Sequence, residues 1–167
     1  MKQTLSVPRW KERHWRPSQR GELNQRQSEW LLETGSMTCR CEQFCQSVTV
    51  QPQFEGFVAA SQLGNEGAEL PADDRYWIRE IFLFGDTIPW IWARTVVPAK
   101  TLDGPLAEVA SLGKIPLGRY LFGHAEPERD YIHVSLDDGL WGRRSRFRLS
   151  GSPLLLTEIF LPAAPLY

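Results

Sequence analysis

Two ionisable side chains stand out in this sequence because each lies among apolar residues in a segment with the pattern of a β-strand. Arg79 lies within residues 75–84, and Glu158 lies within residues 154–161. Side chains alternate between the two faces of a strand. The residues expected on the same faces are all apolar: Trp77, Ile81 and Leu83 beside Arg79, and Leu154, Leu156 and Phe160 beside Glu158. Burying an unpaired charge costs free energy, so each group needs a partner.

The pattern leaves two explanations for this pair of charges. Arg79 and Glu158 form a buried ion pair between two strands, or they bind a ligand that carries complementary groups. An arginine guanidinium is a rigid fork of donors that suits a carboxylate, whereas a desolvated glutamate accepts from a hydroxyl or, when protonated, donates to it. A small carboxylated ring satisfies both groups, and the seven Trp and eight Phe residues can supply flat apolar walls.

The sequence does not indicate a metal or cofactor site. It contains no Gly-rich phosphate loop, no Gly-x-Ser-x-Gly, no His-Glu-x-x-His and no Cys-x-x-Cys. Cys39, Cys41 and Cys45 could supply metal ligands together with a histidine, but their spacing matches no standard zinc pattern. We interpret them as reduced thiols, because their number is odd and the sequence shows no export signal.

Arginines also gather in residues 141–148, which contain four of them. Strand alternation puts Arg144, Arg146 and Arg148 on one face, which predicts a wet, charged face of a sheet. The alternative is that one of the four arginines binds a second carboxylate of a dianionic ligand.

The N-terminal residues 1–27 are basic and polar, with Trp10 and Trp15 among the arginines. We expect them to be a solvated, loosely ordered lead-in to a single domain that spans residues 28–167. Interleaved Arg and Trp side chains can bind single-stranded nucleic acid. The net charge of −1 gives no general electrostatic case for nucleic acid or an anionic membrane. We therefore expect neither as a partner.

The remaining sequence predicts the elements that must position Arg79 and Glu158. Strand patterns cover residues 48–50, 54–58, 75–84, 88–97, 129–136, 142–150 and 154–161, and Pro52 breaks the first run at a bend or a sheet edge. Helical signals cover residues 28–32 after a Ser28 cap, 36–44 after a Ser36 cap, 106–112 before Gly113, and a short stretch from Pro116. Short turns between neighbouring strands, with grouped helices, indicate one α+β domain with a mostly antiparallel sheet.

Membrane and export segments are not apparent. No stretch approaches the roughly 20 apolar residues that span a bilayer. The N-terminus lacks the apolar run of a signal peptide. We therefore expect a cytoplasmic protein without membrane insertion.

Several blocks of the sequence occur together in a recognisable order. They are SMT at 36–38, RYWIREI at 75–81, RTVVP at 94–98, LGKIPLGRYLF at 112–122, GLWGRRSR at 139–146, and residues 149–167. Together they resemble the chorismate pyruvate-lyase family, bacterial enzymes that make 4-hydroxybenzoate for ubiquinone. The resemblance runs from about Trp30 to the C-terminus.

The resemblance implies an antiparallel sheet of six strands, with helices that form flaps over a buried ligand pocket. It also implies a monomer without metal or cofactor. The carboxylate-binding arginine of the family falls on Arg79, backbone amide donors to the same carboxylate fall on Met37 and Leu117, and the glutamate that contacts the 4-hydroxyl falls on Glu158. The implied activity is the elimination of pyruvate from chorismate to give 4-hydroxybenzoate. This favours a ligand clamp over an ion pair.

The alternative function is a non-catalytic effector-binding domain of similar fold. Transcription regulators use such domains to sense small molecules, but they carry a separate helix-turn-helix domain, whose apolar pattern residues 1–27 lack. A lipid carrier would suit the tryptophans but not a buried arginine.

Overall fold

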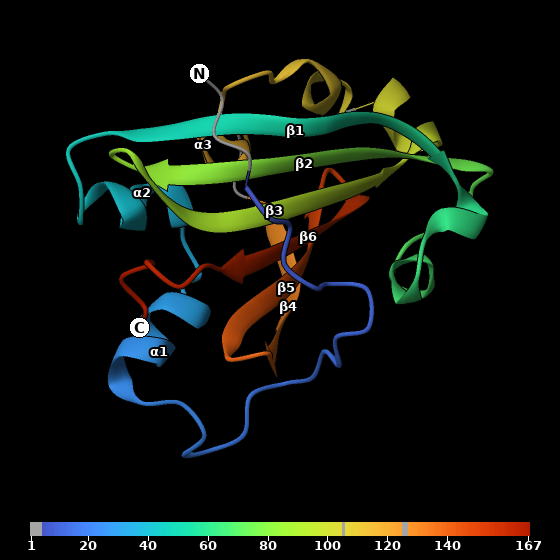
Figure 1. The fold of residues 1–167 in the computed structure, drawn as a ribbon. Helices are drawn as coiled ribbons and strands as arrows, with labels where there is room; N and C mark the ends of the chain where they lie inside the picture. The colour runs from blue at the N-terminus through green and yellow to red at the C-terminus, as the bar shows by residue number, and fades with distance from the viewer. Residues whose placement is uncertain (1–4, 105, 125–126) are drawn as a thin grey trace.

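Six antiparallel strands form one sheet in the computed structural model, which describes residues 5–104, 106–124 and 127–167 (Figure 1). The order across the sheet is β1-β2-β3-β6-β5-β4. The strands are β1 (Val48–Ala59), β2 (Arg75–Gly85), β3 (Ile88–Pro98), β4 (Glu128–Asp137), β5 (Leu140–Leu149) and β6 (Ser152–Phe160). The predicted α+β class with an antiparallel sheet of six strands is confirmed.

The sheet consists of two three-stranded meanders. Tight turns join β2 to β3, β4 to β5 and β5 to β6, whereas the connection from β1 to β2 is longer and contains two 3₁₀ turns, at 60–62 and 65–69. The antiparallel pair β3 and β6 joins the two meanders, with Ile91 opposite Phe160 and Val96 opposite Leu155. The connection between β3 and β4 therefore crosses from the middle of the sheet to its far edge.

Short helices lie between and before the strands. They are α1 (Gln25–Leu31), α2 (Met37–Glu42), α3 (Leu117–His124) and the 3₁₀ turns η1 (Ala60–Gln62), η2 (Asn65–Glu69), η3 (Ala99–Asp103) and η4 (Ala107–Ser111). Ser36 caps α2 as predicted, because its side chain accepts a hydrogen bond from the Cys39 amide.

One local prediction was wrong, and two others gain detail from the structure. Asn24 rather than Ser28 caps α1, and it forms a capping box with Gln27. The helical stretch expected before Gly113 is a 3₁₀ turn over residues 107–111, and Gly113 has the left-handed φ of 57° expected of a terminating glycine. Pro52 lies in an edge strand, as one of the two expected explanations required, but the strand continues through it as β1 with a bulge between Pro52 and Phe54.

The N-terminal segment packs against the sheet in the part that the structure describes. Trp10 is 9% exposed and stacks on Trp92 at 5.9 Å between ring centroids. The Arg13 guanidinium donates to the backbone carbonyl oxygens of Ser135, Asp137 and Leu140. The prediction of a solvated lead-in was therefore wrong for these residues. They lie on an apolar face of the sheet, and covering that face removes apolar surface from water.

Side chains on the two sheet faces form separate cores. One face packs Phe82, Phe84 and Trp92 under the N-terminal segment. The alternating residues of the same strands, including Ile81 and Leu83, pack on the other face against α1 and α2. Among the described residues, no helix is long and apolar enough to cross a membrane.

Candidate active site

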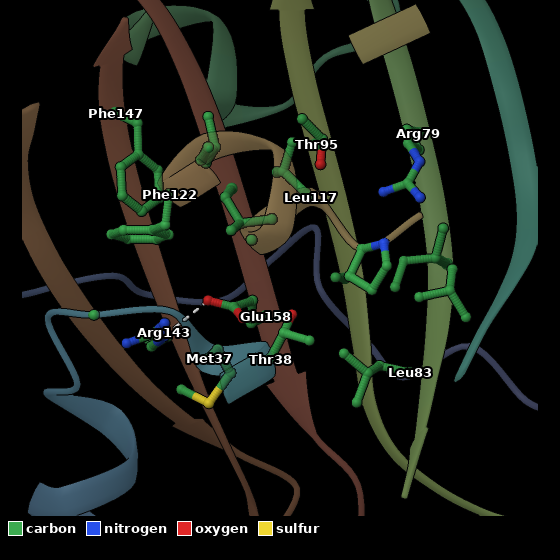
Figure 2. A pocket seen from close by; sticks show the side chains of 18 of the residues that line it. Met37, Thr38, Arg79, Leu83, Thr95, Leu117, Phe122, Arg143, Phe147 and Glu158 are labelled. Carbon is green, nitrogen blue, oxygen red and sulfur yellow. Dashed lines mark hydrogen bonds and ion pairs between the residues drawn. The ribbon is translucent and has the colours of Figure 1, made fainter. Parts of the chain in front are cut away.

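A small cavity of about 50 Å³ lies on the sheet face that carries Ile81 and Leu83 (Figure 2). Residues from all six strands line its floor, and the starts of α2 and α3 form its cover. All four residues singled out from the sequence line this cavity: Met37, Arg79, Leu117 and Glu158. Residues from four separate elements are thus brought together at one place.

Met37 and Leu117 occupy the same position in their helices. Met37 is the first residue of α2, and Leu117 is the first residue of α3, directly after Pro116. The N–H groups in the first turn of a helix have no acceptor within the helix. Both backbone amides are therefore suited to bind an anion, and α2 and α3 contact each other at the cavity.

Arg79 is held by the loop that precedes α3. Its side chain is 1% exposed, and Nη2 donates to the carbonyl oxygens of Gly113 at 3.1 Å and Ile115 at 2.9 Å. Its Nε lies 3.5 Å from the Glu55 carboxylate and, among the described residues, is buried without a hydrogen-bond partner. Burial lowers the pKa of Arg79, and the charge of Glu55 opposes that shift.

Glu158 pairs with a residue other than Arg79. Its Oε1 accepts from Arg143 Nε at 2.8 Å, and both side chains are almost completely buried. Arg79 lies opposite Thr95 of β3, whereas Glu158 lies opposite Ala93 of the same strand. Two strand spacings and two residue steps therefore separate Arg79 from Glu158, roughly 12 Å between Cα atoms. The explanation by an ion pair between these two residues was wrong.

Arg143 and Arg129 also line the cavity. Arg143 Nη1 donates to the Glu33 carbonyl at 2.7 Å, and Arg129 Nη1 donates to the same oxygen at 2.9 Å. Burial, with the nearby Arg143 charge, lowers the pKa of Arg129 to about 10. Strand alternation already put Arg143 on the face opposite Arg144, but only the pairing of β5 with β6 shows that this face is the one with Glu158.

The prediction that one face of β5 is exposed to solvent was wrong for the middle of the strand. Arg144 is 2% exposed, donates to Thr157 and Asn65, and lies 4.7 Å from the Trp15 ring. The N-terminal segment and the region of η2 cover this face, so the charge is buried. Only Arg146 and Arg148, nearer the end of the strand, stay partly exposed.

No metal ligands converge in the described part of the chain, where no group of three or more His, Cys, Asp or Glu side chains could hold an ion. Cys39, Cys41 and Cys45 are free thiols. Cys41 is fully buried, and burial, reinforced by the charge of Glu158, raises the pKa of its thiol to about 12. It therefore stays protonated near neutral pH.

The cavity wall thus carries the Arg79 cation, the Arg143–Glu158 pair and the starts of two helices. The model of a protein family described as chorismate lyase matches residues 10–167. The chain belongs to the chorismate lyase family. This agrees with the family resemblance of the sequence blocks.

Members of the chorismate lyase family with curated names are similar over most of their length. The chorismate pyruvate-lyase of Serratia proteamaculans (strain 568) is 57% identical over 140 residues, which is 84% of this chain and 80% of that protein. The chorismate pyruvate-lyase of Yersinia enterocolitica (serotype O:8 / biotype 1B) is 56% identical over 140 residues, with 84% and 83% covered.

Solved structures of regulators share the fold of this chorismate lyase family member. The C-terminal domain of the histidine utilization repressor from Pseudomonas syringae pv. tomato has a TM-score of 0.51 at 13% identity, covering 70% of this chain and 92% of that one. PhnF from Mycobacterium smegmatis has a TM-score of 0.51 at 14% identity, covering 78% and 65%. At these identities the likeness concerns the fold alone.

Proposed function

We propose that this chain is a chorismate pyruvate-lyase, which converts chorismate into 4-hydroxybenzoate and pyruvate in the first step of ubiquinone biosynthesis. The observation that carries the proposal is the cavity, in which Arg79 and Glu158 face the same enclosed space from opposite ends. The family membership and the names of the relatives support the same activity.

The ring carboxylate of the substrate binds at the Arg79 end. Arg79 has donors left beyond the two that Nη2 makes to Gly113 and Ile115, because a guanidinium carries five N–H groups. The backbone amides of Met37 and Leu117 add two further donors to the same carboxylate. A carboxylate that replaces the lost water contacts with several such donors is held in one orientation.

Glu158 receives the ring hydroxyl at the other end. Its Oε1 is occupied by Arg143, which leaves lone pairs on the carboxylate for a hydroxyl donor. The pair with Arg143 also fixes the carboxylate in place. The ring then lies across β3, over Thr95 and Ala93, between the two ends.

The reaction is an elimination that makes the ring aromatic. The carbon that bears the hydroxyl loses its proton, and those electrons form the new ring double bond. The bond between the neighbouring carbon and the ether oxygen breaks, its electron pair stays on oxygen, and the released enolpyruvate takes up a proton to give pyruvate. Because aromatisation favours the products, the protein has to orient the substrate, exclude water and stabilise the leaving oxygen.

The remaining properties follow the same proposal. The enzyme acts as a cytoplasmic monomer without metal or cofactor, and its ligand contacts all lie within residues 28–167. The helix starts at Met37 and Leu117 act as flaps that open for substrate entry and product release, because both of them line the cavity from above the sheet.

Incubation with chorismate tests the proposal. The purified protein is expected to form 4-hydroxybenzoate, seen by ultraviolet absorbance, together with an equal amount of pyruvate in a coupled assay. Tight binding of chorismate or 4-hydroxybenzoate without any turnover would instead favour an effector-binding domain, the function of the regulators that share this fold. An Arg79→Gln protein serves as the matched negative control.

A further inference from the structure

The end of the cavity near Glu158 carries more positive charge than the proposed contacts use. Arg143 and Arg129 both line it, and their Nη1 atoms share the Glu33 carbonyl oxygen at 2.7 and 2.9 Å. Two guanidinium groups bound to one oxygen atom lie close together. Figure 2 shows Arg143 beside Glu158, with the hydrogen bond between them dashed.

Among the described residues, two carboxylates lie near these two cations, those of Glu158 and Glu33. Glu158 accepts from Arg143 at 2.8 Å, whereas the Glu33 carboxylate pairs with Arg40 at 3.1 Å. Within the described ranges, Arg129 makes no ion pair and its Nε is buried without a hydrogen-bond partner. The guanidinium groups of Arg40, Arg129 and Arg143 thus meet two carboxylates in the described part of the chain. One positive charge is left unbalanced at a partly buried arginine, where an unpaired charge costs free energy. An anionic ligand would remove that cost.

Packing fixes the unbalanced guanidinium at the cavity wall. The Arg129 side chain lies over the Phe147 ring, with Cζ 4.4 Å from the ring centroid, and Phe147 lines the cavity itself. A guanidinium stacked on an aromatic face and tied at Nη1 has little freedom left. Its position is therefore set before a ligand arrives, as a binding site requires.

The inference rests on the proposed function, which places the ring hydroxyl at Glu158. In chorismate the enolpyruvyl ether is attached to the carbon next to the one that bears the hydroxyl, so the second carboxylate of the substrate lies near that end. Arg143 Nε is within 2.8 Å of Glu158, which puts its guanidinium next to the same part of the ring.

We infer that Arg129 and Arg143 bind the carboxylate of the enolpyruvyl group, and hold the pyruvate carboxylate after cleavage. The substrate dianion then meets one cationic group of contacts at each end of the cavity. The product 4-hydroxybenzoate has only the ring carboxylate, so it uses the Arg79 end and leaves the second site to pyruvate.

Comparison of substrate and product binding tests this site. Arg129→Gln is expected to raise the KM for chorismate about tenfold or more, while changing the Kd for 4-hydroxybenzoate less than about threefold. Arg79→Gln is expected to weaken the binding of both chorismate and 4-hydroxybenzoate. Arg148→Gln, which changes a partly exposed arginine of β5, is expected to weaken the binding of neither. Equal losses of both ligands in Arg129→Gln, or no loss of either, would overturn the assignment.

Two further measurements guard against a folding defect. Arg129→Lys keeps the charge and is expected to recover most of the chorismate affinity, so a lysine variant no better than glutamine contradicts the inference. Pyruvate is expected to bind the wild-type protein saturated with 4-hydroxybenzoate. Pyruvate that displaces 4-hydroxybenzoate, or does not bind, also contradicts it. Failure of the proposed function is seen separately, as wild-type protein that forms no 4-hydroxybenzoate.

Discussion

Gly118 of α3 faces Ser36, the N-cap of α2, so closely that a Cβ atom on Gly118 would lie 2.9 Å from Ser36 Oγ. The same Cβ would lie 3.0 Å from Thr38 Oγ1. Only glycine allows this approach without movement. The contact brings together the two helix starts that carry the Met37 and Leu117 amides, so it sets the spacing of both donors.

Gly118→Ala is expected to separate the two helix starts and to lower kcat/KM for chorismate by about 10- to 100-fold, because small misplacements of binding groups cost this much. Steady-state kinetics measure the effect. Gly123→Ala on the same helix is the matched control, since a Cβ at Gly123 meets nothing within 4 Å. Equal kinetics for the two variants would show that the close approach has no role in the reaction.

Arg79→Ala is expected to weaken binding of 4-hydroxybenzoate by about 100-fold, since hydrogen bonds from a charged group contribute about 1.5–3 kcal/mol each. Isothermal titration calorimetry provides the measurement. The exposed Arg75 begins the same strand and stacks on Phe57, so Arg75→Ala controls for the loss of one positive charge. Wild-type affinity in Arg79→Ala would rule out Arg79 as the carboxylate anchor.

Glu158→Gln keeps the shape of the side chain but removes the charge that faces Arg143. We expect kcat for chorismate to fall by about tenfold or more, and the free energy of unfolding to fall by about 1–3 kcal/mol because a buried cation loses its counterion. Urea unfolding and kinetics report the two effects. Glu128→Gln, at an exposed position of β4, is the control. An unchanged rate would mean that the charge of Glu158 takes no part in catalysis.

Trp10→Ala is expected to reduce the free energy of unfolding by about 3–5 kcal/mol, as for other large aromatic residues removed from a core. Trp10 stacks on Trp92 and lies 4.0 Å from the Arg94 guanidinium, on the sheet face opposite the cavity. The KM for chorismate should stay the same where the variant is folded. Arg20→Ala, at an exposed position of the same segment, is the control. Equal free energies of unfolding for Trp10→Ala and Arg20→Ala would contradict the packing of Trp10.

Iodoacetamide at pH 8 is expected to modify Cys39 and to leave Cys41 unmodified in the native protein. Alkylation requires the thiolate, and a thiol with a pKa of about 12 has about one part in ten thousand ionised at that pH. The pKa of Cys41 is raised because burial disfavours the charged thiolate. Mass spectrometry of peptides gives the extent, and urea-unfolded protein, in which both thiols react, is the control. Rapid native labelling of Cys41 would contradict its burial.

Periodicity predicted the strands well because alternation is a local property of the chain. Residues 75–84 and 88–97 form the hairpin that was expected, and Ser36 caps its helix. The ends of helices and strands were harder to predict, because they depend on tertiary packing. Asn24 caps α1 four residues before Ser28. The residues between them show no apolar periodicity that would have indicated this start.

The candidate site was predicted only in part. Arg79 and Glu158 stand out by their apolar neighbours, but Met37 and Leu117 offer backbone groups, which leave no side-chain signal; the family resemblance supplied them. Arg143 was interpreted within an arginine-rich strand. Its partner depends on the pairing of β5 with β6, a contact that local pattern does not determine.

The junction of the two meanders has a consequence for ligand size. Arg79 belongs to the first meander and Glu158 to the second, and the pairing of β3 with β6 is the sheet contact that joins them. In the proposed complex, the register of this strand pair therefore sets the distance that the bound molecule has to span. A slip by two residues would keep every side chain on its face and yet move the carboxylate by about 7 Å along the sheet. Substitutions in the cavity wall that keep this register leave the distance between the two backbone positions unchanged.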